Sequence, residues 1–251
     1  YATSYEYDEN GNQVSSTQHM LAVEVPTGDA LKTLPSLVAS EFDQTTAYQY
    51  DALNRLVSMI DAEGFTTEYQ YDAVGNRASV IQQLNKETGD FSQTFSFYDA
   101  TNRLTHTVSG EGLLTTFEYD AVGNRSAVNV YETAVNVVNG QQPVAVEGDR
   151  VRTTTYQYDE SNRVKEETSP EGTKTQYKYS KRGNRTQVIE AVGLPEQRIT
   201  ENEYDAANRI IKTTQALGSA AEVSTVFEYY ADGQIKTRTE ASGTAQQVAT
   251  N

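Results

Sequence analysis

The seven-residue string YDAVGNR stands at residues 71–77 and again, unchanged, at 119–125, and a near-copy, YSKRGNR, occupies 179–185. A catalytic site is normally built once per domain, whereas a structural unit is built many times in a repeat protein. The repetition is therefore the feature that most constrains this chain. It favours a repeat architecture over an enzyme and makes the period of the repeat the first thing to establish.

The motif begins with Tyr-Asp and recurs along most of the chain in two alternating forms. The glycine-free form reads YDALNRL at 50–56, YDATNRL at 98–104, YDESNRV at 158–164 and YDAANRI at 204–210. The glycine form reads YDENGNQ at 7–13, YDAVGNR twice, YSKRGNR, and an eroded YYADGQI at 229–235. Three steps between the forms are identical, from 50 to 71, from 98 to 119 and from 158 to 179, and each contains a Glu-Gly pair, at Gly64, Gly112 or Gly172. The larger unit is thus motif, strand, Glu-Gly turn, strand, motif.

The segments between motifs alternate with a period of two, which predicts β-strands with one aromatic face and one polar face. In 65–71 the residues Phe65, Thr67, Tyr69 and Tyr71 share one parity, and 113–119 and 173–179 follow the same rule. The segment 91–98 breaks it, because its phenylalanines have the opposite parity from its motif tyrosine. A bulge or a strand covered on both faces would explain this exception.

Because the motif separates two strands, it is expected at the turn of a β-hairpin. Asp can accept hydrogen bonds from backbone N–H groups further along the turn. Gly supplies a positive φ, and Asn tolerates one in the glycine-free form. Arg can bind loop carbonyls or the Asp carboxylate of its own or a neighbouring turn, and Tyr supplies buried area with a polar tip. The residues assigned these structural roles are Tyr7, Asp8, Gly11, Asn12, Tyr50, Asp51, Asn54, Arg55, Tyr71, Asp72, Gly75, Asn76, Arg77, Tyr98, Asp99, Asn102, Arg103, Tyr119, Asp120, Gly123, Asn124, Arg125, Tyr158, Asp159, Asn162, Arg163, Tyr179, Gly183, Asn184, Arg185, Tyr204, Asp205, Asn208 and Arg209.

Composition supports a sheet and excludes several partners. The chain of 251 residues has 17 Tyr and no Trp or Cys, so Tyr and Thr must do much of the packing, which suits a pleated surface. A net charge of −15 argues against nucleic acid and anionic membrane surfaces. No apolar stretch approaches the roughly 18 residues of a membrane span. Since the first residue is Tyr, we expect these residues to come from a longer protein.

The alternating YDALNRL and YDAVGNR units resemble the YD repeats of bacterial Rhs proteins, the C component of insecticidal toxin complexes, and teneurins. The resemblance covers residues 5–235. It implies long antiparallel strands in a continuous curved or spiral sheet that closes into a hollow shell, which in the toxin members encloses a C-terminal toxin and in teneurins serves adhesion. It does not carry self-cleavage to this chain, because the Asp-Pro pair of the autoproteolytic members is missing from the sequence.

The expected organisation is one β-sheet array over 1–235 with longer insertions at about 14–45 and 128–150. Within the first, 31–42 is expected to be a short helix or a loop, and a worn motif is expected at 26–31. Within the second, Asn139-Gly140 between two valine-rich runs predicts an extra, protruding and protease-sensitive hairpin. Residues 236–251 are a polar tail or the start of a further repeat.

The sequence offers few candidate catalytic or metal-binding residues. His19 and His106 are far apart in sequence and are expected to be partly exposed spacers. The sequence lacks G-x-S-x-G, and Glu201 with Glu203 resembles a glycosidase pair only in sharing one strand face. DENGN at 8–12 fails as a calcium loop, because His19 stands where a bidentate Glu is required. Neither a cofactor nor a metal is predicted, and an enzyme is the least favoured class.

The favoured hypothesis is a structural scaffold: a segment of a YD-repeat shell of a bacterial secreted or surface protein that encloses or presents a toxin or effector domain. The alternative is an adhesion module that binds a glycan or a protein through exposed tyrosines. The expected partners are the rest of a larger polypeptide and, through open sheet edges, a second copy of the chain. Buried motif tyrosines would favour the scaffold, and a row of exposed ones would favour adhesion.

Overall fold

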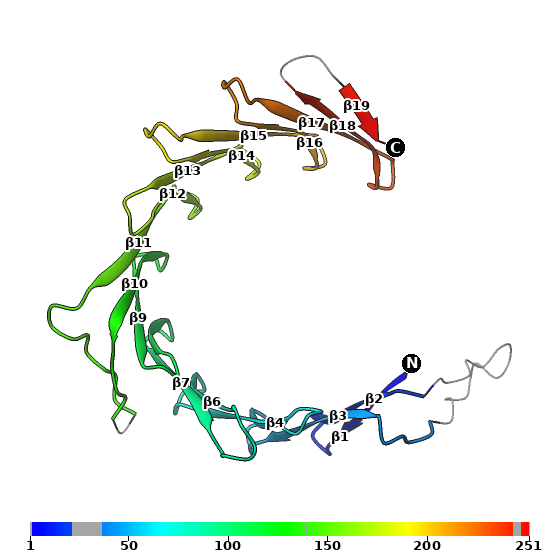
Figure 1. The fold of residues 1–251 in the computed structure, drawn as a ribbon, viewed down its shortest axis with the longest axis vertical. Coiled ribbons are helices and arrows are strands. Elements are labelled where there is room, and N and C mark those ends of the chain that lie inside the picture. Colours follow the sequence, from blue (N-terminus) through cyan, green and yellow to red (C-terminus); the bar gives the residue numbers. More distant parts are fainter. Residues whose placement is uncertain (1, 22–36, 139, 243–246, 251) are drawn as a thin grey trace, which may run out of the picture. The chain divides into compact units, whose positions relative to one another are not determined.

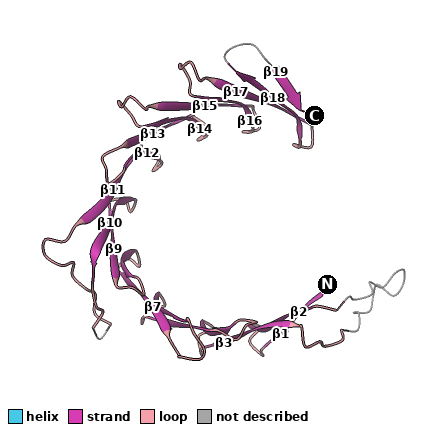
Figure 2. Cartoon of the chain, in the orientation of Figure 1, coloured by secondary structure: helices cyan, strands magenta, loops and turns pink. Residues whose placement is uncertain are grey.

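The segments with period-two alternation form strands in the computed structural model, which describes residues 2–21, 37–138, 140–242 and 247–250. Over these ranges every regular element is a β-strand and none is a helix, so the all-β class is confirmed (Figure 2). The strands are rich in Thr, Tyr, Val and Phe, whose branched or aromatic side chains suit a pleated, half-buried surface. The alternating segments 65–71, 113–119 and 173–179 contain the strands Thr66–Tyr71, Leu113–Tyr119 and Lys174–Tyr179, as predicted.

The chain divides into two compact units, and the division crosses two strands, β9 and β10. Unit 1 comprises residues 1–116 and 131–150, and unit 2 comprises residues 117–130 and 151–251. The strands up to the division are β1 (Ala2–Tyr7), β2 (Gln13–His19), β3 (Gln44–Tyr50), β4 (Leu56–Ile60), β5 (Thr66–Tyr71), β6 (Arg77–Gln83), β7 (Phe91–Tyr98), β8 (Leu104–Val108), β9 (Leu113–Tyr119) and β10 (Arg125–Ala134). Those that follow are β11 (Val151–Tyr158), β12 (Val164–Thr168), β13 (Lys174–Tyr179), β14 (Arg185–Glu190), β15 (Arg198–Tyr204), β16 (Ile210–Gln215), β17 (Val223–Tyr229), β18 (Ile235–Ser242) and β19 (Gln247–Thr250).

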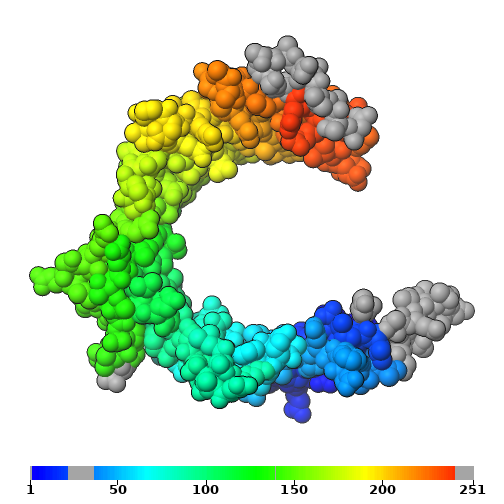
Figure 3. Space-filling model, in the orientation of Figure 1, coloured from blue at the N-terminus to red at the C-terminus, as the bar shows by residue number. Residues whose placement is uncertain are grey.

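Within each unit, consecutive strands pair antiparallel in the order of the sequence, as in β1 with β2, β2 with β3 and β3 with β4 of unit 1. The same pattern runs from β11 to β19 in unit 2 (Figure 1). The space-filling view shows successive bands of colour in each unit, so each hairpin adjoins its sequence neighbours (Figure 3). This confirms the prediction of tandem antiparallel hairpins. As a result, the motif turns lie at one end of the strands and the Glu-Gly turns lie at the other end.

A β-bulge recurs immediately before the motif tyrosine. The register shifts between Gln49 and Tyr50, and between Gln70 and Tyr71, and equivalent shifts precede the other paired motif tyrosines. Since the bulge occurs in hairpins that obey the aromatic parity as well as in β7, it does not by itself explain the exception at 91–98. The extra residue lies in the strand after the turn, as with Val57 of β4, which stands between the partners of Gln49 and Tyr50.

The two phenylalanines of β7 lie on the face opposite the motif tyrosines, and this face is covered in unit 1. Phe95 pairs with Val108, and Val108 pairs with Leu114, so all three side chains share that face. Val108 is 1% exposed and Leu114 is 0% exposed. Phe95 and Val108 line a cavity together with residues 134–137, which follow the end of β10. The face expected to be polar therefore holds the most buried apolar side chains of the described residues, and the opposite parity of the phenylalanines in β7 reflects the cover on this face.

The segment after β10 corrects the prediction of an extra hairpin. Residues 135–138 and 140–150 contain no strand, although two valine-rich runs flank the predicted turn. The segment instead bonds to other parts of unit 1: Val135 N–H donates to the Gly112 carbonyl (2.8 Å), and the Gln142 amide lies 3.1 Å from Nε2 of His106. The valines were the basis of the hairpin prediction, but the segment's own backbone bonds, such as Gln141 N–H to the Val138 carbonyl (3.0 Å), close isolated turns and form no strand ladder among the described residues.

The other two longer segments are partly described. Residues 37–42 form no helix, so in that part the helix alternative is wrong, while the worn motif predicted at 26–31 lies outside the described residues. Residues 236–251, left open as a tail or a further repeat, contain most of β18 and all of β19, and β18 pairs with both β17 and β19.

Candidate functional site

The repeated motif forms a five-residue hairpin turn built around its aspartate. In the turn at 72–76, Asp72 N–H donates to the Asn76 carbonyl (2.9 Å) and Gly75 N–H donates to the Asp72 carbonyl (3.2 Å). Oδ1 of Asp72 accepts from the N–H groups of Val74 (3.0 Å) and Asn76 (2.8 Å). The fourth residue, Gly75, has φ of 97°. This is a type I turn followed by a left-handed residue, a common three-residue hairpin connection.

The glycine-free motif makes the same turn with different residues at the last two positions. In the turn at 51–55, Asn54 takes the place of the glycine, with φ of 59°. The side chain of Arg55 then occupies the place of the asparagine that follows the glycine, and its Nε donates to Oδ2 of Asp51 (2.7 Å). Counting from Tyr-Asp, Asn54 is equivalent to Gly75 and Arg55 to Asn76. Matching the letters Asn-Arg between the two forms misaligns the turns by one residue.

The arginine of the glycine-free turn also contacts the next motif turn at the same end of the strands. Arg163 is bound to Asp159 through Nε (2.8 Å), and its guanidinium lies 4.4 Å above the ring of Tyr179 and 3.5 Å from the Ser180 carbonyl. Arg209 repeats the arrangement with the ring of Tyr229, at 4.5 Å. A planar guanidinium suits this combination of ion pair, stacking and carbonyl binding. One side chain thus closes its own turn and binds the following one.

The arginine of the glycine form has a different role, which the sequence reasoning did not separate. Arg77, Arg125 and Arg185 are exposed and lie over the aromatic ring two residues before the motif tyrosine of their own hairpin. The distances are 5.6 Å to Tyr69, 4.7 Å to Phe117 and 5.6 Å to Tyr177. These arginines cover the aromatic face of a strand rather than a turn.

The asparagine of the glycine turn connects that turn to the glycine-free turn that follows it. Nδ2 of Asn76 donates both to its own Asp72 (2.9 Å) and to Oδ1 of Asn102 in the next turn (3.0 Å). The same link joins Asn12 to Asn54, Asn124 to Asn162 and Asn184 to Asn208, at 2.8–2.9 Å. Within each unit, asparagine links and arginine links alternate along the row of motif turns. The signal was present in the strict alternation of the two motif forms, but sequence alone does not say which turns are neighbours.

The motif tyrosines tie each hairpin to the one before it. The hydroxyl of Tyr71 donates to the Leu56 carbonyl (2.8 Å), and the hydroxyl of Tyr98 donates to the Arg77 carbonyl (3.1 Å). Tyr50, Tyr158, Tyr179, Tyr204 and Tyr229 make the equivalent bond. These seven rings are half-buried, whereas Tyr7 of the first motif is 61% exposed. The tyrosines therefore brace neighbouring hairpins instead of forming an exposed row.

The remaining motif residues lie where the turn places them. Asp8, Asp99, Asp120 and Asp205 repeat the hydrogen bonding of Asp72 or Asp51, and Ser180 replaces the aspartate in the turn at 180–184. The positive φ falls on Gly11, Asn102, Gly123, Asn162, Gly183 and Asn208. Arg103 binds Asp99 at 2.7 Å, and Tyr119 is half-buried at the end of β9.

The aspartates are held as carboxylates. The guanidinium of Arg163 lowers the pKa of Asp159, and the side-chain amide of Asn76 does the same for the pKa of Asp72. The backbone N–H groups of Arg55 and Arg209 are the largest cause of the lowered pKa of Asp51 and Asp205. A carboxylate with several donors is favoured over the acid form, because protonation removes acceptors from the turn.

These lowered pKa values predict how stability depends on pH. An unfolded Asp has a pKa of about 3.9, so the stabilisation is complete above about pH 5 and is lost as the pH falls towards the folded pKa. We expect Asp159→Asn to lower the melting temperature by several degrees at pH 7 and by less at pH 3. Glu160→Gln, which removes the same charge from an exposed position in the same turn, is the control and should change little at either pH. An Asp159→Asn deficit that is equal at both pH values would contradict the carboxylate role.

Because the arginines of the two motif forms have different roles, replacing them is expected to lower stability by unequal amounts. Arg209→Gln removes the ion pair to Asp205, the contact with the Tyr229 ring and the bond to the Tyr230 carbonyl (3.3 Å). Arg185→Gln removes a 5.6 Å ring contact. We expect Arg209→Gln to lower the free energy of unfolding by about 1 kcal/mol and Arg185→Gln by less than half of that, in urea titrations. Equal losses would show that the link between turns contributes nothing.

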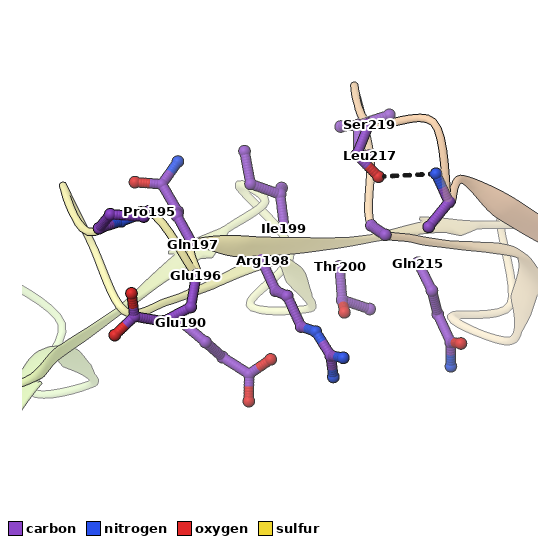
Figure 4. A pocket seen from close by; sticks show the side chains of 12 residues that line it. Glu190, Pro195, Glu196, Gln197, Arg198, Ile199, Thr200, Gln215, Leu217 and Ser219 are labelled. Carbon is purple, nitrogen blue, oxygen red and sulfur yellow. Dashed lines mark hydrogen bonds between the residues drawn. The ribbon is translucent and has the colours of Figure 1, made fainter.

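A groove of about 630 Å³ lies in unit 2 at the opposite end of the strands from the motif turns. It is lined by residues 195–200 and by the turn after β16 at 216–221 (Figure 4). In Figure 4 the side chains of Arg198 and Thr200 point to one side of β15 and that of Ile199 to the other. The charged side chains that line the groove are Glu190, Glu196 and Arg198. Its walls are turns, held by bonds such as Gly193 N–H to Oε1 of Gln197 (2.8 Å).

Glu203 of the Glu201–Glu203 pair, and Glu166 in β12, are engaged in ordinary strand contacts. Glu203 binds Lys212 (3.2 Å), and Glu166 binds Lys174 (2.8 Å), which lowers the pKa of Glu166. Among the described residues, no group of three His, Cys, Asp or Glu side chains is arranged to hold a metal ion. In the same part of the chain, no helix is long and apolar enough to cross a membrane.

His19 departs from the expectation of a partly exposed spacer, whereas His106 is half-buried. His19 is 8% exposed and bonded through both ring nitrogens, to Ser4 and to Asp43. His106 lies under the segment after β10, where burial lowers its pKa and leaves Nδ1 without a hydrogen-bond partner. An isolated His in a polar strand gave no sequence signal for either environment, because each depends on a segment distant along the chain.

Comparison with known proteins identifies the repeat. The family model for the Teneurin YD-shell matches residues 31–220. A crystal structure of TcdB2-TccC3-TEV aligns with 99% of this chain and 15% of its own chain, at 14% identity and a TM-score of 0.51. A Photorhabdus luminescens Tc holotoxin pore structure aligns with 98% and 16%, at 14% identity and a TM-score of 0.34. No curated protein gave a match.

The structural likeness at 14% identity shows the fold alone, and the chain spans 15% of the length of the TcdB2-TccC3-TEV chain that it matches. The family model, by contrast, covers more than half of the chain and includes the linked turns from 51–55 to 205–209. The resemblance inferred from YDALNRL and YDAVGNR is confirmed. The chain belongs to the Teneurin YD-shell family.

Proposed function

We propose that this chain is a wall segment of a YD shell: a structural scaffold within a larger secreted or surface polypeptide, which encloses or presents a toxin or effector domain. The observation that carries the proposal is the continuous linkage of turns within each unit, by asparagine from Asn76 to Asn102 and by arginine from Arg163 to Ser180. These contacts use the motif residues for holding hairpins together. The motif aspartates, arginines and tyrosines are accordingly proposed as structural residues.

The family and the fold support the same role. The YD-shell model matches residues 31–220, and the TcdB2-TccC3-TEV structure shares the fold over nearly the whole chain. A single layer of paired strands has little core of its own, since only a few side chains of the described residues are buried. Such a layer is suited to be stabilised by further strands and to separate two compartments. Adhesion through rows of exposed tyrosines gains no comparable support, because seven motif hydroxyls bond to backbone carbonyls.

The test is to express the complete polypeptide and probe what the shell protects. We expect limited proteolysis to leave a segment outside the YD repeats intact in the wild type and to cleave it in a variant whose turn links are removed, such as Asn76→Ala with Asn184→Ala. Exposed Glu160→Gln serves as the control variant. Equal cleavage in all three proteins would overturn enclosure. Saturable binding of a glycan by the wild type, lost on replacing exposed Tyr5 and Tyr7, would favour adhesion instead.

A further inference from the structure

Three side chains that are distant in sequence form a continuous hydrogen-bonded chain in unit 1. Oγ of Ser4, in β1, lies 2.8 Å from Nε2 of His19, at the end of β2. Nδ1 of the same ring lies 3.0 Å from Oδ2 of Asp43, one residue before β3. The connectivity is hydroxyl, imidazole, carboxylate, with the two ring nitrogens used separately. This is the order of contacts in which a serine is activated by a general base that a carboxylate orients.

The strands explain why these groups meet. β1 pairs with β2 so that Ala2 lies opposite His19 and Ser4 lies opposite Thr17. Because residues two apart share a face, Ser4 and His19 project to the same side of the hairpin. β2 then pairs with β3 from Gln44 onwards, which brings Asp43 beside the end of β2. Register alone therefore assembles the three side chains, with no local sequence motif.

In the neutral form of the ring, the hydrogen bonds also fix which nitrogen carries the proton. Asp43 accepts from the backbone N–H groups of Met20 (3.0 Å) and Ser40 (3.1 Å), and these donors, the Met20 N–H foremost, lower its pKa. A carboxylate held in this way is an acceptor, so Nδ1 of His19 donates to it. Nε2 is then left with its lone pair towards Ser4, whose hydroxyl donates to it. The tautomer required of a general base is the one that this network selects.

Burial separates this relay from a surface contact. The side chains of His19 and Asp43 are 11% and 9% exposed, while Ser4 is half-buried. The base and its orienting carboxylate are thus shielded from water, and the hydroxyl is the member nearest to solvent. The other described histidine, His106, contacts the side-chain amide of Gln142.

We propose that Ser4 is an activated nucleophile, with His19 as its general base and Asp43 as a positioning residue, and that it accepts an acyl group from a carboxylic ester. Oγ of Ser4 forms a bond to the carbonyl carbon as its proton passes to Nε2 of His19. The bond from that carbon to the leaving alkoxide breaks, and the alkoxide takes the proton from Nε2. Water, deprotonated by Nε2, then attacks the acyl-serine and releases the acid, and the proton returns to Ser4.

The first experiment treats the full chain with a fluorophosphonate and maps the modified peptide by mass spectrometry. Labelling at Ser4 is expected, and absence of labelling at Ser4 in the wild type would overturn the proposal. Because general-base catalysis contributes about 100-fold or more, His19→Gln should slow labelling by about that factor, and Asp43→Asn should slow it while keeping an acceptor for the backbone. Ser16→Ala, on the other face of the same hairpin, should label at the wild-type rate.

The second experiment separates activation from mere accessibility. With p-nitrophenyl acetate, the wild type should release nitrophenol in a burst with acetyl retained on Ser4, and Ser4→Ala should show no burst. Circular dichroism spectra and melting temperatures verify that each variant is folded. If a folded His19→Gln variant is acylated as fast as the wild type, Ser4 is only an accessible hydroxyl and the proposal fails.

Discussion

Replacing Leu114 with alanine is expected to lower the free energy of unfolding by about 2–5 kcal/mol, the usual range for a fully buried leucine. The side chain is 0% exposed and lies opposite Val108, itself 1% exposed, on the covered face of unit 1. The removed methyl groups leave a space between paired strands and residues that already fit closely. Urea denaturation followed by circular dichroism measures the loss, with the midpoint falling and the slope unchanged.

Leu113→Ala is the matched control. Leu113 is the preceding residue of β9, has the opposite parity and is 37% exposed. Its truncation should cost less than about 1 kcal/mol, because less apolar area leaves the protein interior. If the two alanine variants are equally stable, the face opposite the motif tyrosines is not the core of unit 1.

Gly112→Ala is expected to be more damaging than the same substitution at Gly64, at Gly172 or at any motif glycine. Its φ is +85°, which costs an L-residue about 1–2 kcal/mol. An added Cβ would also lie 2.9 Å from the Val135 carbonyl oxygen and 3.1 Å from Cβ of Ala134, and forcing these apart adds about 1–3 kcal/mol. A total of about 2–5 kcal/mol is expected, measured as for Leu114→Ala.

Gly123→Ala isolates the backbone contribution. Gly123 has φ of +96°, and nothing lies within 4 Å of the position of an added Cβ. Gly123→Ala should therefore lower the free energy of unfolding by only about 1–2 kcal/mol. The excess of Gly112→Ala over Gly123→Ala measures how firmly the segment after β10 is held against the Glu-Gly turn. No excess would mean that this segment moves away without cost.

Local rules account for most of the fold. Alternating Thr and Tyr predicted the strands, and Asp followed three residues later by Gly or Asn predicted the turns, because both depend on contacts within a few residues. The letter pattern was less informative about individual side chains. Asn54 and Asn76 carry the same letter, yet the first supplies a positive φ and the second supplies a link between turns. Position relative to the aspartate, rather than residue type, decides the role.

Contacts between distant segments account for what the sequence could not predict. The cover over Phe95 and Val108 comes from residues after β10, whose valines indicated a hairpin of their own. The relay through His19 depends on the register of two strand pairs and on Asp43, which lies beyond residues 22–36 in the chain. Neither contact leaves a periodic signal, because each occurs once.

The alternation of asparagine and arginine links has a consequence for how such chains lengthen. Each turn accepts one type of link from its predecessor and offers the other type to its successor. Loss or duplication of a single hairpin would place two turns of the same kind side by side, with two donors or two acceptors unmatched at the junction. Gain or loss of hairpins in twos preserves every junction. Evolution and engineering of this array should therefore add or remove an even number of hairpins, so that viable lengths differ by whole pairs of hairpins.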